Sequence, residues 1–231
     1  MAVSLLAGLG LWQVGEGAWI YAKARLAQHL LQRAWAQTAD GESRVAPWPW
    51  ADTWPVARLR VPAHRVDLIV LAGISGRTLA FGPGHASVSA SPGAPGTSIV
   101  TGHRDTHFRF LADVRVGEEI VVELAGQPPA RFIVRETAVA DARTATIRSA
   151  EDTSSLVLLT CYPFDAIVPG GPLRYVVVAD RSPGRTADAA PEGLAGPDRP
   201  MRLVADEPSA KERPQRALTG AVRGEDRTHE P

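Results

Sequence analysis

Short apolar runs broken by turn residues occupy the middle of this 231-residue chain and constrain its fold more than any other feature. Val, Ile and Leu dominate these runs, and Gly, Pro and Asp separate them, as is typical of strands and turns. No segment with helix-length periodicity lies between most of them, so the pattern predicts an all-β barrel or sandwich with short helices. The expected strands are Ala57–Val61, Asp67–Leu71, Ser98–Thr101, Glu119–Leu124, Arg131–Val139, Ser155–Cys161 and Arg174–Ala179, with a weaker one near Leu79.

The amino-terminal segment is apolar enough to raise the question of a membrane anchor. Between Ala2 and Ala22 the only strongly polar side chains are Ser4, Gln13 and Glu16, and the run has about the length that a bilayer requires. Glu16 and four glycines weaken it as a spanning helix, and the basic residues follow the run instead of preceding it. We interpret residues 1–22 as a candidate transmembrane anchor, with an amphipathic packing helix as the alternative.

The segment after the candidate anchor combines a helical pattern with a proline-rich stretch. Apolar side chains recur at three- and four-residue spacing over residues 18–38, which predicts an amphipathic helix. The prolines between Pro47 and Pro55 interrupt any helix, and the tryptophans among them are expected to pack against the domain or to form a membrane-interface belt. Residues 23–54 are therefore predicted to be an amphipathic helix and a Trp/Pro-rich linker.

Composition also limits the partners of the chain. Lysine plus arginine equals aspartate plus glutamate, 25 of each, and no phosphate loop, RNA-binding motif or zinc-finger cysteine set occurs, so we expect no nucleic-acid partner. One cysteine excludes an internal disulfide and a thiolate metal site, and no cofactor is expected. The folded domain is predicted at residues 55–181, and residues 182–231 are predicted to be a disordered tail because they contain too little apolar surface to fold.

The single cysteine, Cys161, ends the apolar run SLVLLTC. A cysteine in that place is either a small buried residue or a displayed nucleophile. A nucleophilic cysteine needs a base or a cation nearby, because the thiolate is the attacking species. Of the six histidines, only His85, His103 and His107 lie well inside the predicted domain.

Two residues at other strand ends complete a candidate site. Gly102-His103 closes the predicted strand Ser98–Thr101, and Arg174 opens the strand that follows Cys161. Strand ends followed by loops are places where a rigid scaffold presents functional side chains. An arginine there can donate fixed hydrogen bonds to a developing oxyanion. Each signal alone has a plain structural explanation, and the combination favours a cysteine-dependent enzyme.

Together these strand ends resemble those of the sortases. The resemblance rests on TGHRDTHF (residues 101–108), on LLTCYPF (residues 158–164) and on Arg174, and it covers most of residues 58–180. The two strings and PWPWADTWP (residues 47–55) look most like the Gram-negative, proteobacterial branch. The resemblance implies an eight-stranded sortase-type β-barrel with an active-site groove.

The same resemblance implies roles for individual residues. Cys161 would be the nucleophile, His103 the general acid/base, and Arg174 the residue that positions substrate or stabilises the oxyanion. Three further residues are expected beside the substrate: Thr160, Tyr162 and His85. A zinc site using His103 and His107 is a minor alternative, because no third ligand is apparent.

The implied reaction is transpeptidation at an LPxTG-like sorting signal. The thiolate would cleave the Thr–Gly bond of a partner protein, form a thioacyl-enzyme and pass the acyl group to an amine acceptor. The implied location is the inner (plasma) membrane, with the catalytic domain facing the periplasm or the outside. Two alternatives stay open: a cysteine peptidase that releases the acyl group to water, and a non-catalytic, membrane-tethered β-barrel that binds a partner and buries Cys161 in its core.

Overall fold

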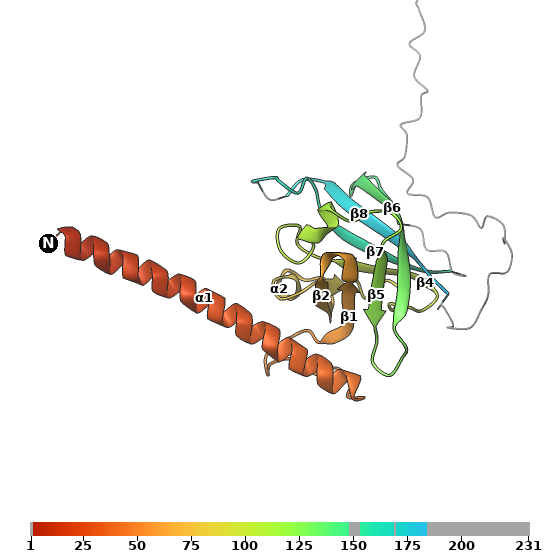
Figure 1. The fold of residues 1–231 in the computed structure, drawn as a ribbon, viewed down its shortest axis with the longest axis horizontal. Coiled ribbons are helices and arrows are strands. Elements are labelled where there is room, and N and C mark those ends of the chain that lie inside the picture. The colour runs from red at the N-terminus through yellow and green to blue at the C-terminus, as the bar shows by residue number, and fades with distance from the viewer. Residues whose placement is uncertain (1, 148–152, 169, 184–231) are drawn as a thin grey trace, which may run out of the picture.

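The computed structural model describes residues 2–147, 153–168 and 170–183, and Figure 1 shows a long helix lying against a strand-rich body. Residues 184–231, most of the predicted tail, lie outside the described residues. The elements are α1 (Ala2–Ala39), β1 (Pro55–Val61), η1 (Pro62–His64), β2 (Val66–Ala72), α2 (Gly76–Leu79), β3 (Gly84–His85), β4 (Gly96–Thr101), η2 (Arg109–Ala112), β5 (Glu119–Glu123), β6 (Ala130–Asp141), β7 (Ser154–Cys161) and β8 (Leu173–Arg181).

The eight strands form a closed barrel in the order β1-β2-β3-β4-β7-β8-β6-β5. The β2–β3 and β4–β7 pairs are parallel, and the other pairs are antiparallel. The predicted all-β barrel is therefore confirmed, and the sandwich alternative is not. Closure leaves no free edge among the described strands, so each main chain is paired on both sides.

The barrel interior is filled by alternate residues of the strands. In β1, Ala57, Leu59 and Val61 are buried and the residues between them are half-buried, which is the period of two expected for a strand with one face on the core. Residues of η2 and the loop before it close one end, where Phe108 and Leu111 are fully buried. The main core comprises Ala57, Leu59, Val61, Val70, Val100, Phe108, Leu111, Val114, Ile120, Val122, Ala130, Phe132, Val134, Leu156, Leu158, Val177 and Ala179.

The weak strand expected near Leu79 is wrong, because Leu79 ends the helical turn α2. Ser75 begins this turn by accepting a hydrogen bond from the Thr78 backbone N–H, a side-chain cap that favours helix over strand. The strand of this region is the two-residue β3, where an added Cβ on Gly84 would lie 2.2 Å from the Gly73 carbonyl oxygen. Glycine at position 84 is therefore required for the close approach of the two backbones.

Helix α1 is continuous from Ala2 to Ala39, so the candidate anchor and the predicted amphipathic helix belong to one element. Its carboxyl-terminal part packs on β2, where Leu31 and Trp35 contact Ile69 and Leu71. The half that precedes this contact is exposed at Trp12, Trp19 and the other described positions, and Figure 1 shows it projecting clear of the barrel. Among the described residues, no helix combines the length and apolar character needed to cross a bilayer.

The proline-rich stretch before β1 folds back against the contact between α1 and β2. Trp48 packs edge-on against Phe81 with ring centroids 4.7 Å apart, beside the contact of α1 with β2. Trp54 lies under the Arg44 guanidinium at 5.2 Å, whereas Trp50 is exposed. Packing therefore accounts for two of the three tryptophans in this stretch.

Candidate functional site

The register of the barrel brings the three predicted catalytic residues to one end of neighbouring strands. The parallel β4–β7 ladder ends at the pair Thr101–Leu159, so His103 follows β4 two residues beyond the end of the ladder and Cys161 lies two residues beyond it in β7. In the antiparallel β7–β8 ladder Cys161 pairs directly with Arg174. His103, Cys161 and Arg174 therefore lie at the same end of the neighbouring strands β4, β7 and β8, and we call these three residues the row.

Cys161 and Arg174 lie on the outer face of the barrel wall. Leu156, Leu158 and Thr160 point into the barrel, so the alternating residues Val157, Leu159 and Cys161 point outward. Arg174 faces the same way as its cross-strand partner Cys161. Cys161 is half-buried and not part of the core, which argues against the buried-thiol interpretation.

Local packing determines where β4 leaves the ladder and releases His103. The Gly102 N–H donates to the Leu159 carbonyl at 3.2 Å, and the Thr160 hydroxyl, 2% exposed, donates to the Gly102 carbonyl at 2.7 Å. Phe108 closes the loop through its N–H, which donates to the His103 carbonyl at 2.9 Å. An added Cβ on Gly102 would lie 2.9 Å from the Phe108 ring, so only glycine lets the ring pack there. His103 itself is exposed beyond this anchor.

Arg174 is held by the loop that precedes it. Its Nη1 donates to the Gly171 carbonyl at 2.8 Å and to the Leu173 carbonyl at 2.9 Å. Within the described part of the chain, no hydrogen bond uses its Nε or Nη2, so these donors are available to another acceptor. The Arg174 charge also acts on Asp141 of β6, whose pKa is lowered to about 2, mainly by hydrogen bonds from Arg143.

The residues expected beside the substrate fall into two groups. Tyr162 follows Cys161 and stacks on Tyr175, with Phe164 edge-on to both rings. Phe164 and Tyr175 pack against the main core, so this aromatic cluster lies on the face opposite to Cys161 and Arg174. Thr160 is buried and fixes Gly102, as described above. His85 is also buried, with its Nε2 at 2.9 Å from the Ala90 carbonyl and 3.2 Å from the Ser89 hydroxyl. Thr160 therefore supports the loop that carries His103, whereas His85 holds the segment before β4.

His107 is the second histidine at this end of the barrel. Burial, and next the charge of His103, lower the pKa of His107 below its usual range, while Asp105 acts in the opposite direction. His107 lines a pocket of about 530 Å³ between the start of β2 and η2. Among the described residues, no group of three or more metal-ligating side chains occurs, so the zinc alternative has no ligand set there.

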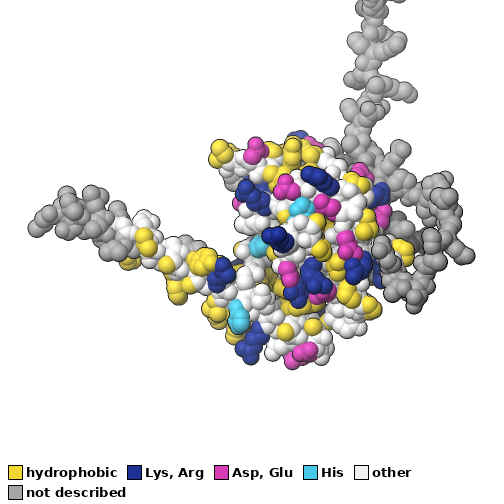
Figure 2. Space-filling model, viewed as in Figure 1, with side chains coloured by type: hydrophobic (Ala, Val, Ile, Leu, Met, Phe, Trp, Pro, Cys, Tyr) yellow, Lys and Arg dark blue, Asp and Glu magenta, His cyan; other side chains and the backbone are white. Residues whose placement is uncertain are grey.

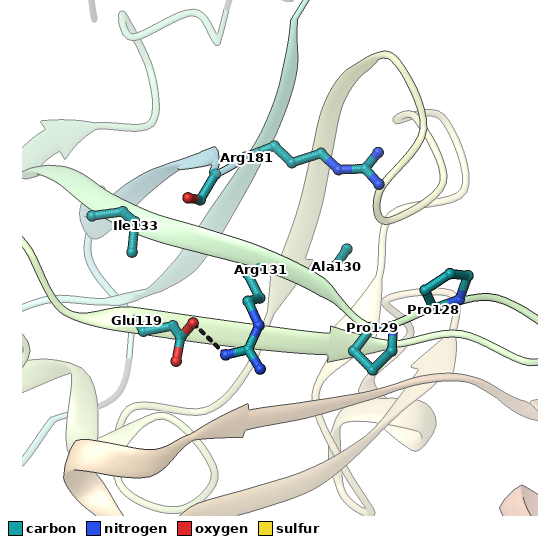
Figure 3. Close-up of a pocket in the computed structure, with 8 residues that line it drawn as sticks. Glu119, Pro128, Pro129, Ala130, Arg131, Ile133 and Arg181 are labelled. Carbon is teal, nitrogen blue, oxygen red and sulfur yellow. Dashed lines mark hydrogen bonds and ion pairs between the residues drawn. The ribbon is translucent and has the colours of Figure 1, made fainter. Parts of the chain in front are cut away.

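Another pocket of the described surface lies away from this row. A pocket of about 720 Å³ is bordered by Pro128 to Arg131 and by Arg181, and Figure 3 shows Arg131 paired with Glu119 in it. Arg174 and Arg181 lie at opposite ends of β8, about 20 Å apart in an extended strand. Figure 2 shows acidic, basic and histidine side chains interspersed over the visible face, with no broad patch of a single charge. We therefore place the candidate site at His103, Cys161 and Arg174, which together present an imidazole, a thiol and a guanidinium.

One residue at this end of the barrel was missed from the sequence. Arg104 is 9% exposed, and its Nη2 donates to the Ala166 carbonyl at 2.8 Å in the loop between β7 and β8. An arginine on a loop after a strand normally remains solvated, so its position gave no signal. The only hint was its place next to His103.

Comparison with known proteins accounts for this arrangement of strands and residues. The Sortase domain family matches residues 59–182, more than half of the chain. This chain belongs to the sortase family. The resemblance found in the sequence is therefore confirmed at the family level.

Individual sortases are similar to this one over part of their length. Sortase D of Bacillus subtilis (strain 168) is 30% identical over 123 residues, which make up 53% of this chain and 62% of that protein, so less than two thirds of that relative is matched. The Clostridium perfringens Sortase D5 transpeptidase has a TM-score of 0.55 and 18% identity, with 69% of this chain and 99% of that chain covered. Sortase A from Corynebacterium diphtheriae has a TM-score of 0.53 and 21% identity, with coverages of 70% and 86%. At such identities the two structures show a shared fold.

Proposed function

We propose that this sortase is a cysteine transpeptidase that cleaves an LPxTG-like sorting signal between Thr and Gly. The observation that carries the proposal is that Cys161 and Arg174 are direct cross-strand partners and that His103 follows β4 at the same end of the barrel. A thiol, an imidazole and a guanidinium in one row supply a nucleophile, an acid/base and an oxyanion donor.

The proposed chemistry has two balanced halves. The Cys161 thiolate attacks the threonine carbonyl carbon, and Arg174 donates hydrogen bonds to the oxyanion that forms. The C–N bond then breaks, the His103 imidazolium gives its proton to the departing glycine amine, and a thioester remains on Cys161. An acceptor amine attacks the thioester, neutral His103 takes up the amine proton, and the new amide leaves as the thiolate is regenerated.

Partner and location follow from the same proposal. The substrate is an exported protein that ends in the sorting signal, and the acceptor is a primary amine. We propose that the barrel works outside the inner membrane, and that the TGHRDTHF string assigns the protein to the Gram-negative branch of the family.

Active-site substitutions with an internally quenched LPxTG peptide test the proposal. Cys161→Ala and His103→Ala should each abolish cleavage while the fold survives, and His29→Ala on the exposed side of α1 should cleave like the wild type. Mass spectrometry should detect an acyl adduct on Cys161, and added hydroxylamine should divert the product from the free acid to the hydroxamate. Full activity of either active-site variant would exclude the proposal, and an unchanged product with hydroxylamine would favour the peptidase alternative.

A further inference from the structure

Arg104 directly follows His103 and is 9% exposed, which is unusual for a loop arginine. Its Nη2 donates to the Ala166 carbonyl at 2.8 Å and reaches the Val168 carbonyl at 3.4 Å. These acceptors are 62 and 64 positions further along the chain, in the loop that follows Cys161. The side chain therefore joins the loop that carries the proposed acid/base to the loop that follows the proposed nucleophile.

The charge of Arg104 is not used in an ion pair with any described residue. Its Nη1 is also buried and has no hydrogen-bond partner in the part of the chain that the structure describes. Burying a guanidinium costs free energy that an acidic partner normally offsets. A buried arginine that binds only two carbonyls therefore costs more free energy than a side chain needed only for packing, which indicates a positional role.

The loop held by Arg104 is fixed at its base and exposed at its far part. At the base, the Tyr162 N–H donates to the Leu173 carbonyl at 3.1 Å. In the far part, Ile167, between the two carbonyls that Arg104 binds, is 98% exposed, and Val168, which carries one of them, is 76% exposed. Exposed apolar side chains near a nucleophile provide a surface that an extended peptide can cover.

We propose that Arg104 is a positioning residue whose guanidinium fixes residues 166–168 in the loop that follows Cys161, so that Ile167 and Val168 are presented to the peptide. This inference rests on the proposed function. Arg104 acts through the loop and does not touch the reacting atoms. Its loss should therefore weaken peptide binding and leave the thiol itself unaltered.

The test compares Arg104→Met, Arg104→Lys and the control Arg115→Met, which removes the same charge from an exposed position. Methionine fills similar volume without a buried charge, so the fold should survive. We expect Arg104→Met to lower kcat/KM for the LPxTG peptide by about 10- to 100-fold, mostly through KM, because small displacements of positioning groups have effects of this order. Arg104→Lys keeps one donor and should lose less, and Arg115→Met should lose nothing.

The alkylation rate of Cys161 and the cleavage kinetics together distinguish a positioning role of Arg104 from a direct effect on the thiol. The rate at which iodoacetamide alkylates Cys161 should be the same in Arg104→Met and the wild type. Parallel losses of alkylation and cleavage would overturn the inference, because Arg104 would then act on the nucleophile. Wild-type kinetics in Arg104→Met would overturn it as well.

Hydrogen exchange tests whether Arg104 holds the loop, even if the proposed function fails and the wild type cleaves no peptide. Amides of residues 164–168 should exchange faster in Arg104→Met than in the wild type or Arg115→Met. Unchanged exchange in this segment would show that Arg104 does not hold the loop.

Discussion

Cys161 and Arg174 are direct partners across the last pair of the antiparallel β7–β8 ladder, and both side chains point to the outside of the barrel. Directly opposed residues on one face of a sheet have Cβ atoms about 5 Å apart. The thiol and the guanidinium therefore share one patch of surface without any loop having to close over them.

Arg174→Lys should lower kcat/KM for the peptide by about 100- to 1,000-fold, the loss typical of removing an oxyanion donor. Lysine keeps the charge, but it lacks the planar fork that binds the Gly171 and Leu173 carbonyls and leaves further donors available. Steady-state kinetics measures the effect. Arg181→Lys is the matched control, since Arg181 also donates to a carbonyl, that of Gly93, from the other end of β8. Equal losses in the two variants would contradict the oxyanion role.

Gly102→Ala should lower the free energy of unfolding by about 1–3 kcal/mol, the usual cost of overpacking. The new Cβ would lie 2.9 Å from the fully buried Phe108 ring, so either the ring or the loop that carries His103 must move. Urea unfolding gives the free energy, and peptide cleavage should fall with it. Gly76→Ala is the control, because nothing lies within 4 Å of its added Cβ. Similar stability of the two variants would show that the Phe108 contact is looser than described.

The stability of the native protein should fall as the pH drops from about 7 through the native pKa of His107. The unfolded chain binds a proton at this histidine near pH 6.5, and burial lowers the pKa of His107 in the native state. The unfolded state therefore binds more protons in this window, which favours unfolding as the pH falls.

Urea unfolding at pH 7.5 and at pH 5 measures this effect. His107→Gln should show a smaller fall than the wild type, whereas His29→Gln, on the exposed surface of α1, should show the wild-type fall. An undiminished fall in His107→Gln would place the responsible group elsewhere.

Leu31→Ala should lower the free energy of unfolding by about 2–5 kcal/mol, as for other fully buried leucines. Leu31 is fully buried between α1 and β2, so its removal leaves a cavity beside Trp35, Ile69 and Leu71. Leu26→Ala, on the same helix but 57% exposed, should change stability by less than about 0.5 kcal/mol. Chemical denaturation distinguishes them, and equal effects would mean that α1 does not dock as described.

The sequence pattern was sufficient for the long strands because Val, Ile and Leu dominate them, as in β7, where four successive residues from Ser155 to Leu158 are buried. It was insufficient for β3, since Gly84 and His85 have no strand propensity and are held by their neighbours β2 and β4. The helical turn α2 was missed because its signal is a single cap, Ser75, and the apolar residues after it read equally well as a strand.

The candidate site was predictable in its members but not in its arrangement. Cys161 and His103 could be found because each stands at the end of a recognisable strand. Their placement in one row depends on the parallel register of β4 with β7, which no local pattern encodes. Arg104 was missed for the same reason, because its burial depends on carbonyls 62 and 64 positions away.

The parallel β4–β7 ladder also has a kinetic consequence. The Thr160 hydroxyl and the Gly102 carbonyl join positions 58 residues apart, and no hairpin can form this pairing early. Non-local pairings of this kind slow folding, because a long loop must close before any contact compensates its entropy. Cys161 and His103 are thus brought to the same end of the barrel only after most of it has assembled. In a refolding experiment, the return of activity should coincide with the completion of the barrel, so that a partly folded chain does not carry a working thiol-imidazole pair.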